Sequence, residues 1–334
     1  MSDKLQRNSR RALLRAAAAA AAGWAGAGLP GAALAADPAY PTKPIRLVVP
    51  FPPGSGAEVS ARFFGQKLSE MTGQPVIIDP RGGGNGFIGV QAVLGAPHDG
   101  YTLLFGSSST LATNAALFKK LPYDPLKDFS AISVVGGVPH ALVVNPSLHV
   151  NSVPELVQYA KANPGALSYP YANSTTRITA ATFGVMTQSK LLEVPYKAYP
   201  QAVSDLLGGQ TKMMFIDFTT GLTHIKAGKL KVLAITPERS NKLPGVPAMS
   251  EVLPGFSIAN WNGIFAPKGT PDDIVKMLNH EITAVLALPE VQKQVDTIGY
   301  ELIKPMTPAE FTKYVVSEHR YFGELVRNAG IQPE

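Results

Sequence analysis

A glycine-rich turn between an apolar run and a helical pattern, within residues 45–71, constrains the fold of this chain most. Ile45–Val49 is short, apolar and β-branched, which predicts a buried strand. Pro52 ends that strand, because proline cannot donate to a sheet ladder. The segment Gly54–Gly56 permits a sharp turn, and apolar residues then recur at helical spacing up to Met71. Free amide groups at such a helix start can hold an anion, although the same pattern also fits a plain strand-to-helix connection.

Predicted strands and helices alternate along the first part of the chain. Val76–Asp79 and Tyr101–Phe105 are two further apolar runs typical of buried strands, and each precedes residues with helical spacing. This alternation predicts an α/β fold with a parallel sheet. Ligands of such sheets lie at the carboxyl ends of the strands. We therefore expect the loops that begin at Gly54 and at Ser107 to share one edge of the sheet.

Two long β-type runs indicate that the chain leaves one lobe and later returns to it. Phe129–Val144 is broken by two glycines and a proline, so we predict two strands in line instead of one. Phe256–Ala266 is a similar run. The two crossings predict an α/β fold of two lobes, with residues 40–139 and 262–334 in the first and residues 140–261 in the second. The mainly helical tail after Pro271 is expected to pack on the first lobe, and closure of the hinge around a ligand is a known use of this architecture.

The second predicted lobe contains a matching loop, Ala172–Ile178, which follows a strand and opens a helix. Ser174, Thr175 and Thr176 are good helix caps, and their hydroxyl groups can also bind a ligand oxygen. Asp217 follows another apolar run, where it either contacts a ligand or caps a helix. A polar helix start in each lobe favours a ligand site between the lobes.

The first 35 residues have the layout of an export signal. A basic stretch that ends at Arg15 precedes an alanine-rich run and a small-x-small sequence, which predicts cleavage after Ala35. The pair Arg10-Arg11 resembles a twin-arginine signal, and an ordinary secretory signal with two arginines is the alternative. Pro30 and several glycines leave the apolar run short for a membrane anchor. Because the chain contains no cysteine, we expect an exported, disulfide-free protein of the bacterial periplasm.

Composition and motifs argue against several other functions. The net charge of +6 comes largely from the export signal, since the remaining residues include 25 basic and 23 acidic ones, and we expect no nucleic-acid partner. Gly84, Gly86 and Gly89 match a dinucleotide-binding pattern, but they stand too far from the strand and no acidic residue ends the next one. No nucleophile elbow or phosphate-binding loop occurs, and each of the six scattered histidines is expected to be exposed or locally hydrogen-bonded. We expect no catalysis, no cofactor and no metal.

Seven motifs resemble the Bug-type extracytoplasmic solute-binding proteins of tripartite tricarboxylate transporters. In chain order they are PFPPGSG (50–56), DGYTLL (99–104), KKLPYDPLKDF (119–129), VPYK (194–197), DLLGGQ (205–210), HIKAGKLKVLAIT (224–236) and FAPKGTP (265–271). The resemblance implies a two-lobed, type II-like periplasmic binding protein that delivers a small organic mono- or dicarboxylate to a membrane permease, and we expect a monomer. The alternative is a periplasmic protein that presents a carboxylate to a signalling system. The sequence does not distinguish this role from transport.

The resemblance also implies that backbone amides, hydroxyl groups and ordered water hold the carboxylate. The residues that match the family's ligand loops are Gly54, Ser55, Gly56, Ala57, Ser107, Ser108, Ser109, Asn173, Ser174, Thr175 and Thr176, with Asp217 at a family position near the ligand. One departure is Glu58, where the family usually has aspartate, and its longer side chain could alter the first loop or enter the pocket.

A second departure is Arg177, where a smaller residue is common in the family. A guanidinium group suits a carboxylate, so we hypothesise that Arg177 binds the second acidic group of a dicarboxylate. A solvated arginine on the outer face of the helix is the alternative. Trp261, in the predicted return crossing, is expected either to pack in the hinge or to form a stacking platform.

Overall fold

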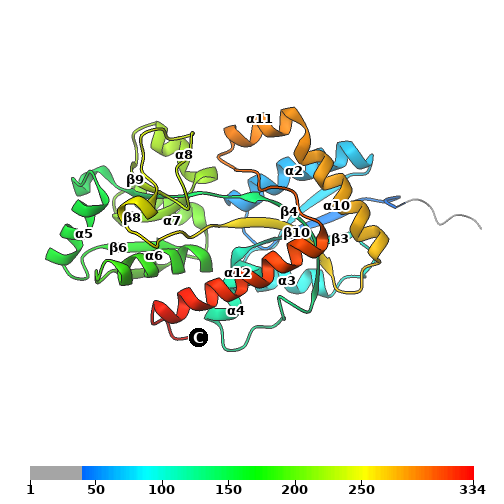
Figure 1. Cartoon of the computed structure of the whole chain (residues 1–334), viewed down its shortest axis with the longest axis horizontal. Helices are drawn as coiled ribbons and strands as arrows, with labels where there is room; N and C mark the ends of the chain where they lie inside the picture. The colour runs from blue at the N-terminus through cyan, green and yellow to red at the C-terminus, as the bar shows by residue number, and fades with distance from the viewer. Residues whose placement is uncertain (1–39) are drawn as a thin grey trace, which may run out of the picture. The chain divides into compact units, whose positions relative to one another are not determined.

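Residues 40–334 are described by the structure, which is a computed structural model, and the predicted export signal lies outside them. The strands of this part of the chain form three sheets. We call the part that contains the five-stranded sheet the first lobe and the part that contains the two smaller sheets the second lobe (Figure 1). Helices accompany both, so the predicted α/β class is confirmed.

The sheet of the first lobe is mixed. In spatial order its strands are β2 (Val76–Pro80), β1 (Ile45–Val49), β3 (Thr102–Ser107), β10 (Trp261–Pro267) and β4 (Phe129–Gly137). The pairs β1–β2 and β1–β3 are parallel, as predicted, whereas β10 runs antiparallel to both β3 and β4. The carboxyl ends of β1 and β3 therefore lie at one edge, which faces the second lobe.

The second lobe has two small sheets in place of one. Its three-stranded sheet has the order β8 (Met213–Asp217), β5 (His140–Val144) and β9 (Lys231–Thr236), and β5 runs antiparallel to both neighbours. The two-stranded sheet pairs β6 (Ser168–Tyr171) with β7 (Leu192–Pro195) in parallel.

The two crossings differ from each other. The first consists of β4 and β5 with a break at residues 138–139, which confirms the prediction of two strands in line. The second is a strand only from Trp261 onward, although the apolar run begins at Phe256. The partners of β10 end at Ser107 and Gly137, so the residues before Trp261 have no strand to pair with in that sheet. The crossings meet where the Val138 amide donates to the Asn260 carbonyl at 2.8 Å.

Helices cover both lobes. Those of the first lobe are α2 (Gly56–Thr72), α3 (Phe87–Leu94), α4 (Asn114–Leu117), α10 (Asp272–Ala287), α11 (Pro289–Thr297) and α12 (Pro308–Asn328), with the 3-10 turn η1 (Gly84–Gly86) and the π-helical turn η2 (Ser109–Thr113). Those of the second lobe are α5 (Val153–Ala162), α6 (Ser174–Met186), α7 (Tyr199–Leu207), α8 (Phe218–Lys226) and α9 (Met249–Val252), with the 3-10 turn η3 (Pro146–Leu148).

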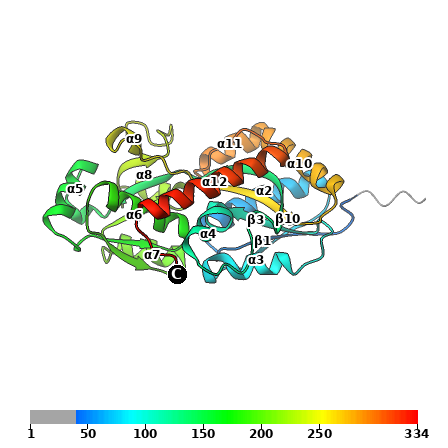
Figure 2. The ribbon, with the colours of Figure 1, turned by 60° about the horizontal axis from the view of Figure 1, so that its bottom comes forward.

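The last helix, α12, runs along both lobes (Figures 1 and 2). Its Phe311 packs with Trp261 in the core of the first lobe. Its Phe322 and Val326 belong to a core cluster that both lobes share, with Leu117 from the first lobe and Phe215 from the second. The predicted packing of the tail on the first lobe is therefore observed, and the end of α12 reaches the second lobe as well. Its apolar face is long enough to cover the junction, which the sequence could not reveal without the position of the second lobe.

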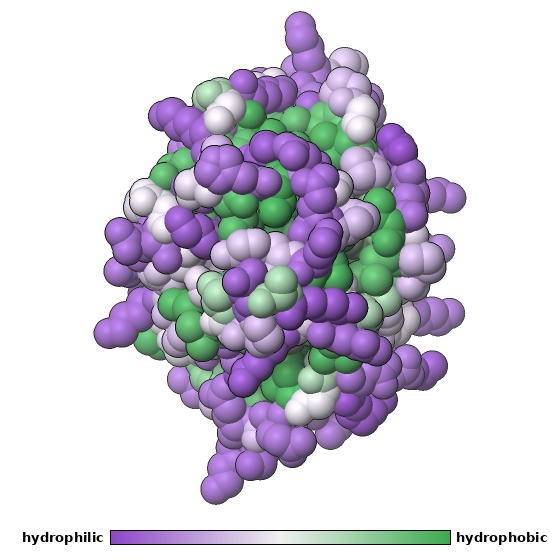
Figure 3. All heavy atoms as spheres, turned by 90° about the vertical axis from the view of Figure 1, so that its left-hand side faces the viewer, coloured by the Kyte–Doolittle hydropathy of each residue, from purple (hydrophilic) through white to green (hydrophobic). Residues whose placement is uncertain are grey.

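The surface of the second lobe is mixed in character. At the end of the molecule that carries α5, hydrophilic side chains predominate and apolar groups lie among them (Figure 3). Within residues 40–334, none of the helices combines the length and the apolar character needed to cross a membrane.

Candidate ligand-binding site

A cavity lies between the lobes, where loops at strand ends of both lobes face each other. It is lined by Phe51, Pro52, Ser55, Gly56, Ala57, Ser107, Ser109, Val138, His140, Ala172, Asn173, Tyr199, Asp217, Asn260 and Asn262. It leaves about 40 Å³ for the centres of water molecules, which is room for a few ordered waters. Seven of the residues predicted from the family resemblance are in this wall: Ser55, Gly56, Ala57, Ser107, Ser109, Asn173 and Asp217.

The loop between β1 and α2 presents a helix start to the cavity. Ser55 is the N-cap of α2, and its Oγ accepts from the Glu58 amide at 3.3 Å. Gly54 has a φ of +79°, a left-handed conformation that glycine adopts without strain. The amides of Gly56 and Ala57 are in the first turn, where a helix provides no acceptor for them. Gly54 itself is not among the lining residues but shapes the turn that places them.

Glu58 does not enter the cavity. Its Oε2 accepts from the Gly54 amide at 3.3 Å, and its Oε1 pairs with Arg62 one turn further along α2. The Glu58 side chain thus points back toward the loop that precedes α2, and its hydrogen bond stabilises the turn at Gly54. The longer side chain is accommodated without loss of space for a ligand.

Of the serines that follow β3, some line the cavity and some form hydrogen bonds between the two lobes. Ser107 Oγ is buried in the cavity wall without a hydrogen-bond partner. Ser108 Oγ is 3.1 Å from Thr175 Oγ1 and also bonds Asn260, and it does not line the cavity. Ser109 Oγ is 2.9 Å from Thr175 Oγ1 and lines the cavity as well.

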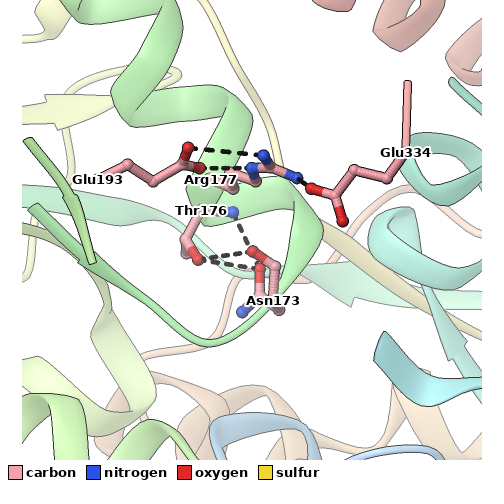
Figure 4. A network of polar contacts seen from close by, with 5 residues as sticks. All are labelled: Asn173, Thr176, Arg177, Glu193 and Glu334. Atoms are coloured by element: carbon pink, nitrogen blue, oxygen red, sulfur yellow. Dashed lines mark hydrogen bonds and ion pairs between the residues drawn. The ribbon is translucent and has the colours of Figure 1, made fainter. Parts of the chain in front are cut away.

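Most polar side chains at the helix start of the second lobe are already hydrogen-bonded to other protein groups. Asn173 is the N-cap of α6, and its Oδ1 accepts from the Thr176 amide at 2.9 Å (Figure 4). The Thr176 hydroxyl also bonds Asn173, and the Ser174 hydroxyl bonds Asn114 of the first lobe. Of this predicted group, Asn173 lines the cavity, while Ser174, Thr175 and Thr176 use their hydroxyl groups in the protein's own structure. We call the cross-lobe bonds of Ser108, Ser109, Thr113 and Asn114 to residues 173–175 the hydroxyl seam.

Arg177 lies outside the cavity wall. Its guanidinium group pairs with Glu193 of β7 and, at 2.6 Å, with Glu334 Oε1 near the end of the described chain (Figure 4). It also lies 5.5 Å from the ring centre of Tyr171. The side chain is 13% exposed, so the alternative of a freely solvated arginine does not describe it either. In this arrangement its donors are directed at two glutamates.

Asp217 caps a helix, as one of the two alternatives predicted, and it also stands in the cavity wall. It is the N-cap of α8, where its Oδ1 accepts from the Thr220 amide at 2.8 Å, and it lines the cavity. Burial raises the pKa of its carboxyl group. A β-carbon placed on Gly56 would lie 2.7 Å from Asp217 Oδ1, so the two lobes are in close contact at this pair.

Sequence reasoning missed half of the cavity wall. His140, Tyr199, Asn260 and Asn262 add polar groups, and Phe51, Pro52, Val138 and Ala172 add apolar surface. His140 is 1% exposed and its Nδ1 has no partner, so the expectation of an exposed or locally bonded histidine is wrong there. The available signal was position: His140 directly follows the break in the first crossing, and Asn260 and Asn262 stand on either side of Trp261 in the second.

Trp261 is a packing residue. It is fully buried among Phe265, Phe311 and Tyr314, and its Nε1 donates to Glu318 at 3.0 Å. Its neighbours Asn260 and Asn262 line the cavity while it does not. Alternation along the strand sends the indole to the opposite side.

The cavity wall has little formal charge. None of its lining residues is lysine or arginine, and its titratable side chains are His140, Tyr199 and Asp217. An anion held there would depend on amide and hydroxyl donors and on the positive ends of α2 and α6. Elsewhere in residues 40–334, no three histidine, cysteine, aspartate or glutamate side chains are grouped so as to hold a metal ion.

Comparisons with known proteins agree with this geometry. Residues 60–331 match the family described as tripartite tricarboxylate transporter family receptor. The structure of Rpa4515 from R. palustris with adipate is 33% identical, covers 88% of this chain and all of that one, and has a TM-score of 0.85. The periplasmic binding protein BugD is 30% identical with a TM-score of 0.83, over 88% of this chain and 100% of its own. MatC from Rhodopseudomonas palustris with bound malate is 27% identical with a TM-score of 0.81, over 86% of this chain and 100% of its own.

Proposed function

Because the chain belongs to the receptor family of tripartite tricarboxylate transporters, a family of non-enzymatic solute-binding proteins, we propose that it captures a dicarboxylate in the interlobe cavity. It then delivers this solute to the membrane permease of such a transporter. The single observation that carries the proposal is the cavity itself, where two helix starts and neutral donors from both lobes converge. The adipate and malate in the two related structures are both dicarboxylates, which supports this ligand class.

The chemistry of capture follows from the wall. One carboxylate accepts hydrogen bonds from the first-turn amides of α2 and from the hydroxyl groups of Ser55 and Ser107. Helix dipoles stabilise its charge without a cation, because the positive ends of α2 and α6 both reach the cavity. The remaining length of the ligand lies among Asn173, Asn260 and Asn262, whose amides can bond the second carboxylate directly or through water.

Capture also requires the lobes to move. The two lobes are in contact around the cavity through the hydroxyl seam and through Gly56 and Asp217, so we infer that these contacts open before the ligand enters. We place the moving bodies at residues 40–139 with 262–334 and at residues 140–261, with hinges at the two crossings. The hydroxyl seam then re-forms on closure and gives the permease a closed surface to recognise.

We further propose a periplasmic monomer, exported by the signal in residues 1–35 and cleaved near Ala35. The relationship to the periplasmic binding protein BugD supports this location. Mature protein isolated from a periplasmic extract should begin near Ala36 by mass spectrometry. An intact leader in that fraction would contradict the export proposal.

A thermal-shift screen tests the ligand class. A ligand that binds only the folded state adds about 2.7 kcal/mol at a hundredfold excess over Kd, which is roughly 5 °C in Tm for a chain of this size. Adipate and malate should give the largest shifts, with hexanoate as the monocarboxylate control. Shifts from neutral sugars or lysine, and none from any carboxylate, would refute the proposal.

A further inference from the structure

His140 occupies an unusual position in the cavity wall. It is the first residue of β5, immediately after the break in the first crossing, and it is 1% exposed. Its Nδ1 is buried and has no hydrogen-bond partner. Buried polar groups of native proteins are almost always paired, so an unpaired ring nitrogen beside a cavity indicates a partner that occupies the cavity.

The groups around His140 do not supply that partner. In the sheet it stands opposite Asp217 of β8 and Thr236 of β9. Asp217 directs Oδ1 to the start of α8, and the Thr236 hydroxyl donates to the Ile258 carbonyl at 2.8 Å. Tyr199 of α7 also lines the cavity, and its hydroxyl donates toward the Phe215 carbonyl at 3.3 Å.

The remaining charged groups nearby are also engaged elsewhere. Glu301 reaches the first crossing through backbone bonds to Gly137, but its carboxylate accepts from Ser240 at 3.0 Å. Glu58 of α2 pairs with Arg62. Asp217 and Tyr199 are therefore the titratable groups that share the cavity with His140.

We propose that the imidazole of His140 donates a hydrogen bond to a carboxylate of the bound ligand and takes up one proton from the solvent as the ligand enters. This inference rests on the proposed function, and it assigns to His140 the protonation change that accompanies binding of the anionic ligand. In the neutral ring one nitrogen donates to the carboxylate, and the proton taken up binds the other nitrogen.

The electrostatics of the cavity support proton uptake. Burial lowers the pKa of His140 to about 4, so the ring is neutral in the empty cavity at neutral pH. No lysine or arginine lines the wall, hence a dianion would find no compensating cation there. An anion within about 4–6 Å favours the charged imidazole and raises its pKa. Between the two pKa values, binding is coupled to proton uptake, and affinity should rise as the pH falls.

Calorimetry with adipate tests the proposal. Titrations near pH 6 in buffers of different ionisation enthalpy give the number of protons taken up per ligand. We expect uptake of up to one proton by the wild-type protein, and none by His140→Gln, which keeps a donor without a titratable group. His140→Leu should weaken adipate by roughly 10- to 100-fold, the usual effect of losing a hydrogen bond to a charged group.

Asp217→Asn is the matched control, since Asp217 is the other group that could take up the proton. Uptake that persists in Asp217→Asn and disappears in His140→Gln supports the proposal. Uptake that disappears only in Asp217→Asn overturns it. If the histidine variants fail to fold, ¹⁵N-histidine NMR of the wild-type protein decides, because the His140 ring signals should move toward imidazolium values when adipate is added, and unchanged signals would refute the proposal.

The same experiment separates this inference from the proposed function. Adipate binding without proton uptake, and with unchanged affinity in both His140 variants, would refute only the role of His140. Failure of the wild-type protein to bind adipate, malate or any other carboxylate would refute the proposed function together with the inference.

Discussion

The starts of α2 and α6 are built from the same local pattern but have different surroundings. Each follows a strand, carries a polar N-cap and reaches the interlobe cavity. At α2, Gly56 and Ala57 line the cavity in the first turn of the helix, where their amides have no acceptor within the helix. At α6, the hydroxyl groups of Ser174 and Thr175 bond the first lobe. One helix start is thus available to a ligand, and the other mainly joins the lobes.

This difference shows how far a local motif can predict a binding site. Both helix starts have the potential to hold an anion, because that potential comes from the backbone. Whether the side-chain donors remain free depends on what the opposite lobe places against them. Three substitutions can test the division between a ligand-facing and a lobe-joining helix start.

The largest effect is expected for Gly56→Ala at the ligand-facing start. The new β-carbon would lie 2.7 Å from Asp217 Oδ1 and 3.1 Å from Thr219 Cβ, so the lobes could not close fully. Overpacking of this kind costs about 1–3 kcal/mol, which corresponds to a loss of affinity of roughly 5- to 150-fold. Calorimetric titration with adipate measures this loss of affinity.

Gly323→Ala is a suitable control, because its β-carbon would meet only Arg327 Nη1 at an ordinary 3.5 Å. That variant should bind adipate like the wild-type protein. Equal affinities for wild type and Gly56→Ala would show that the closed contact of Gly56 and Asp217 is unimportant for binding.

An intermediate effect is expected for Thr175→Val in the hydroxyl seam. Thr175 Oγ1 lies 3.1 Å from Ser108 Oγ, 2.9 Å from Ser109 Oγ and 3.3 Å from Thr113 Oγ1. Valine keeps the shape and leaves these buried hydroxyl groups without a common partner, at a cost of about 1–3 kcal/mol in the free energy of unfolding.

Chemical denaturation of Thr175→Val should show this loss in the free energy of unfolding. The affinities of the variant for adipate and for hexanoate should fall by the same factor. Thr312→Val is the control, since that hydroxyl is exposed and bonds within its own helix. A loss confined to one ligand would mean that Thr175 contacts the ligand directly.

The smallest effect is expected for Arg177→Gln. Its partners Glu193 and Glu334 have side chains that are 37% and 57% exposed, so solvent screens the ion pairs and the loss should be about 0.5–1 kcal/mol in the free energy of unfolding. Glu193→Gln should have a similar effect on stability, which makes it the matched control.

Arg177→Gln also tests the hypothesis that this residue selects dicarboxylates. With its donors on two glutamates, we expect the ratio of adipate to hexanoate affinity to stay unchanged in calorimetric titrations. A selective loss of adipate affinity of tenfold or more would place Arg177 in the site after all.

The pattern of residues predicted the elements well and the wall of the cavity only in part. The break in Phe129–Val144 predicted β4 and β5 because two glycines and a proline interrupt one β-type run. The strand–turn–helix at Gly54 predicted a first-lobe loop that does line the cavity at Ser55, Gly56 and Ala57. These features are local, since hydrogen-bonding capacity and allowed backbone angles belong to the segment itself.

His140, Asn262 and the end of α12 show what could not be predicted. Their roles depend on which groups lie opposite them, and those groups are far away in sequence. His140 stands beside Asp217, Asn262 accepts from Tyr300, and Phe322 belongs to a core cluster that both lobes share.

The alternation of strands and helices, the two crossings and the helix start in each lobe could thus be predicted from the residues alone. Packing of the lobes against each other sets which donors remain free, which serine and threonine hydroxyls join the lobes, and which histidine is buried without a partner. Backbone conformation depends on neighbours along the chain, whereas burial and hydrogen-bond partners depend on neighbours in space.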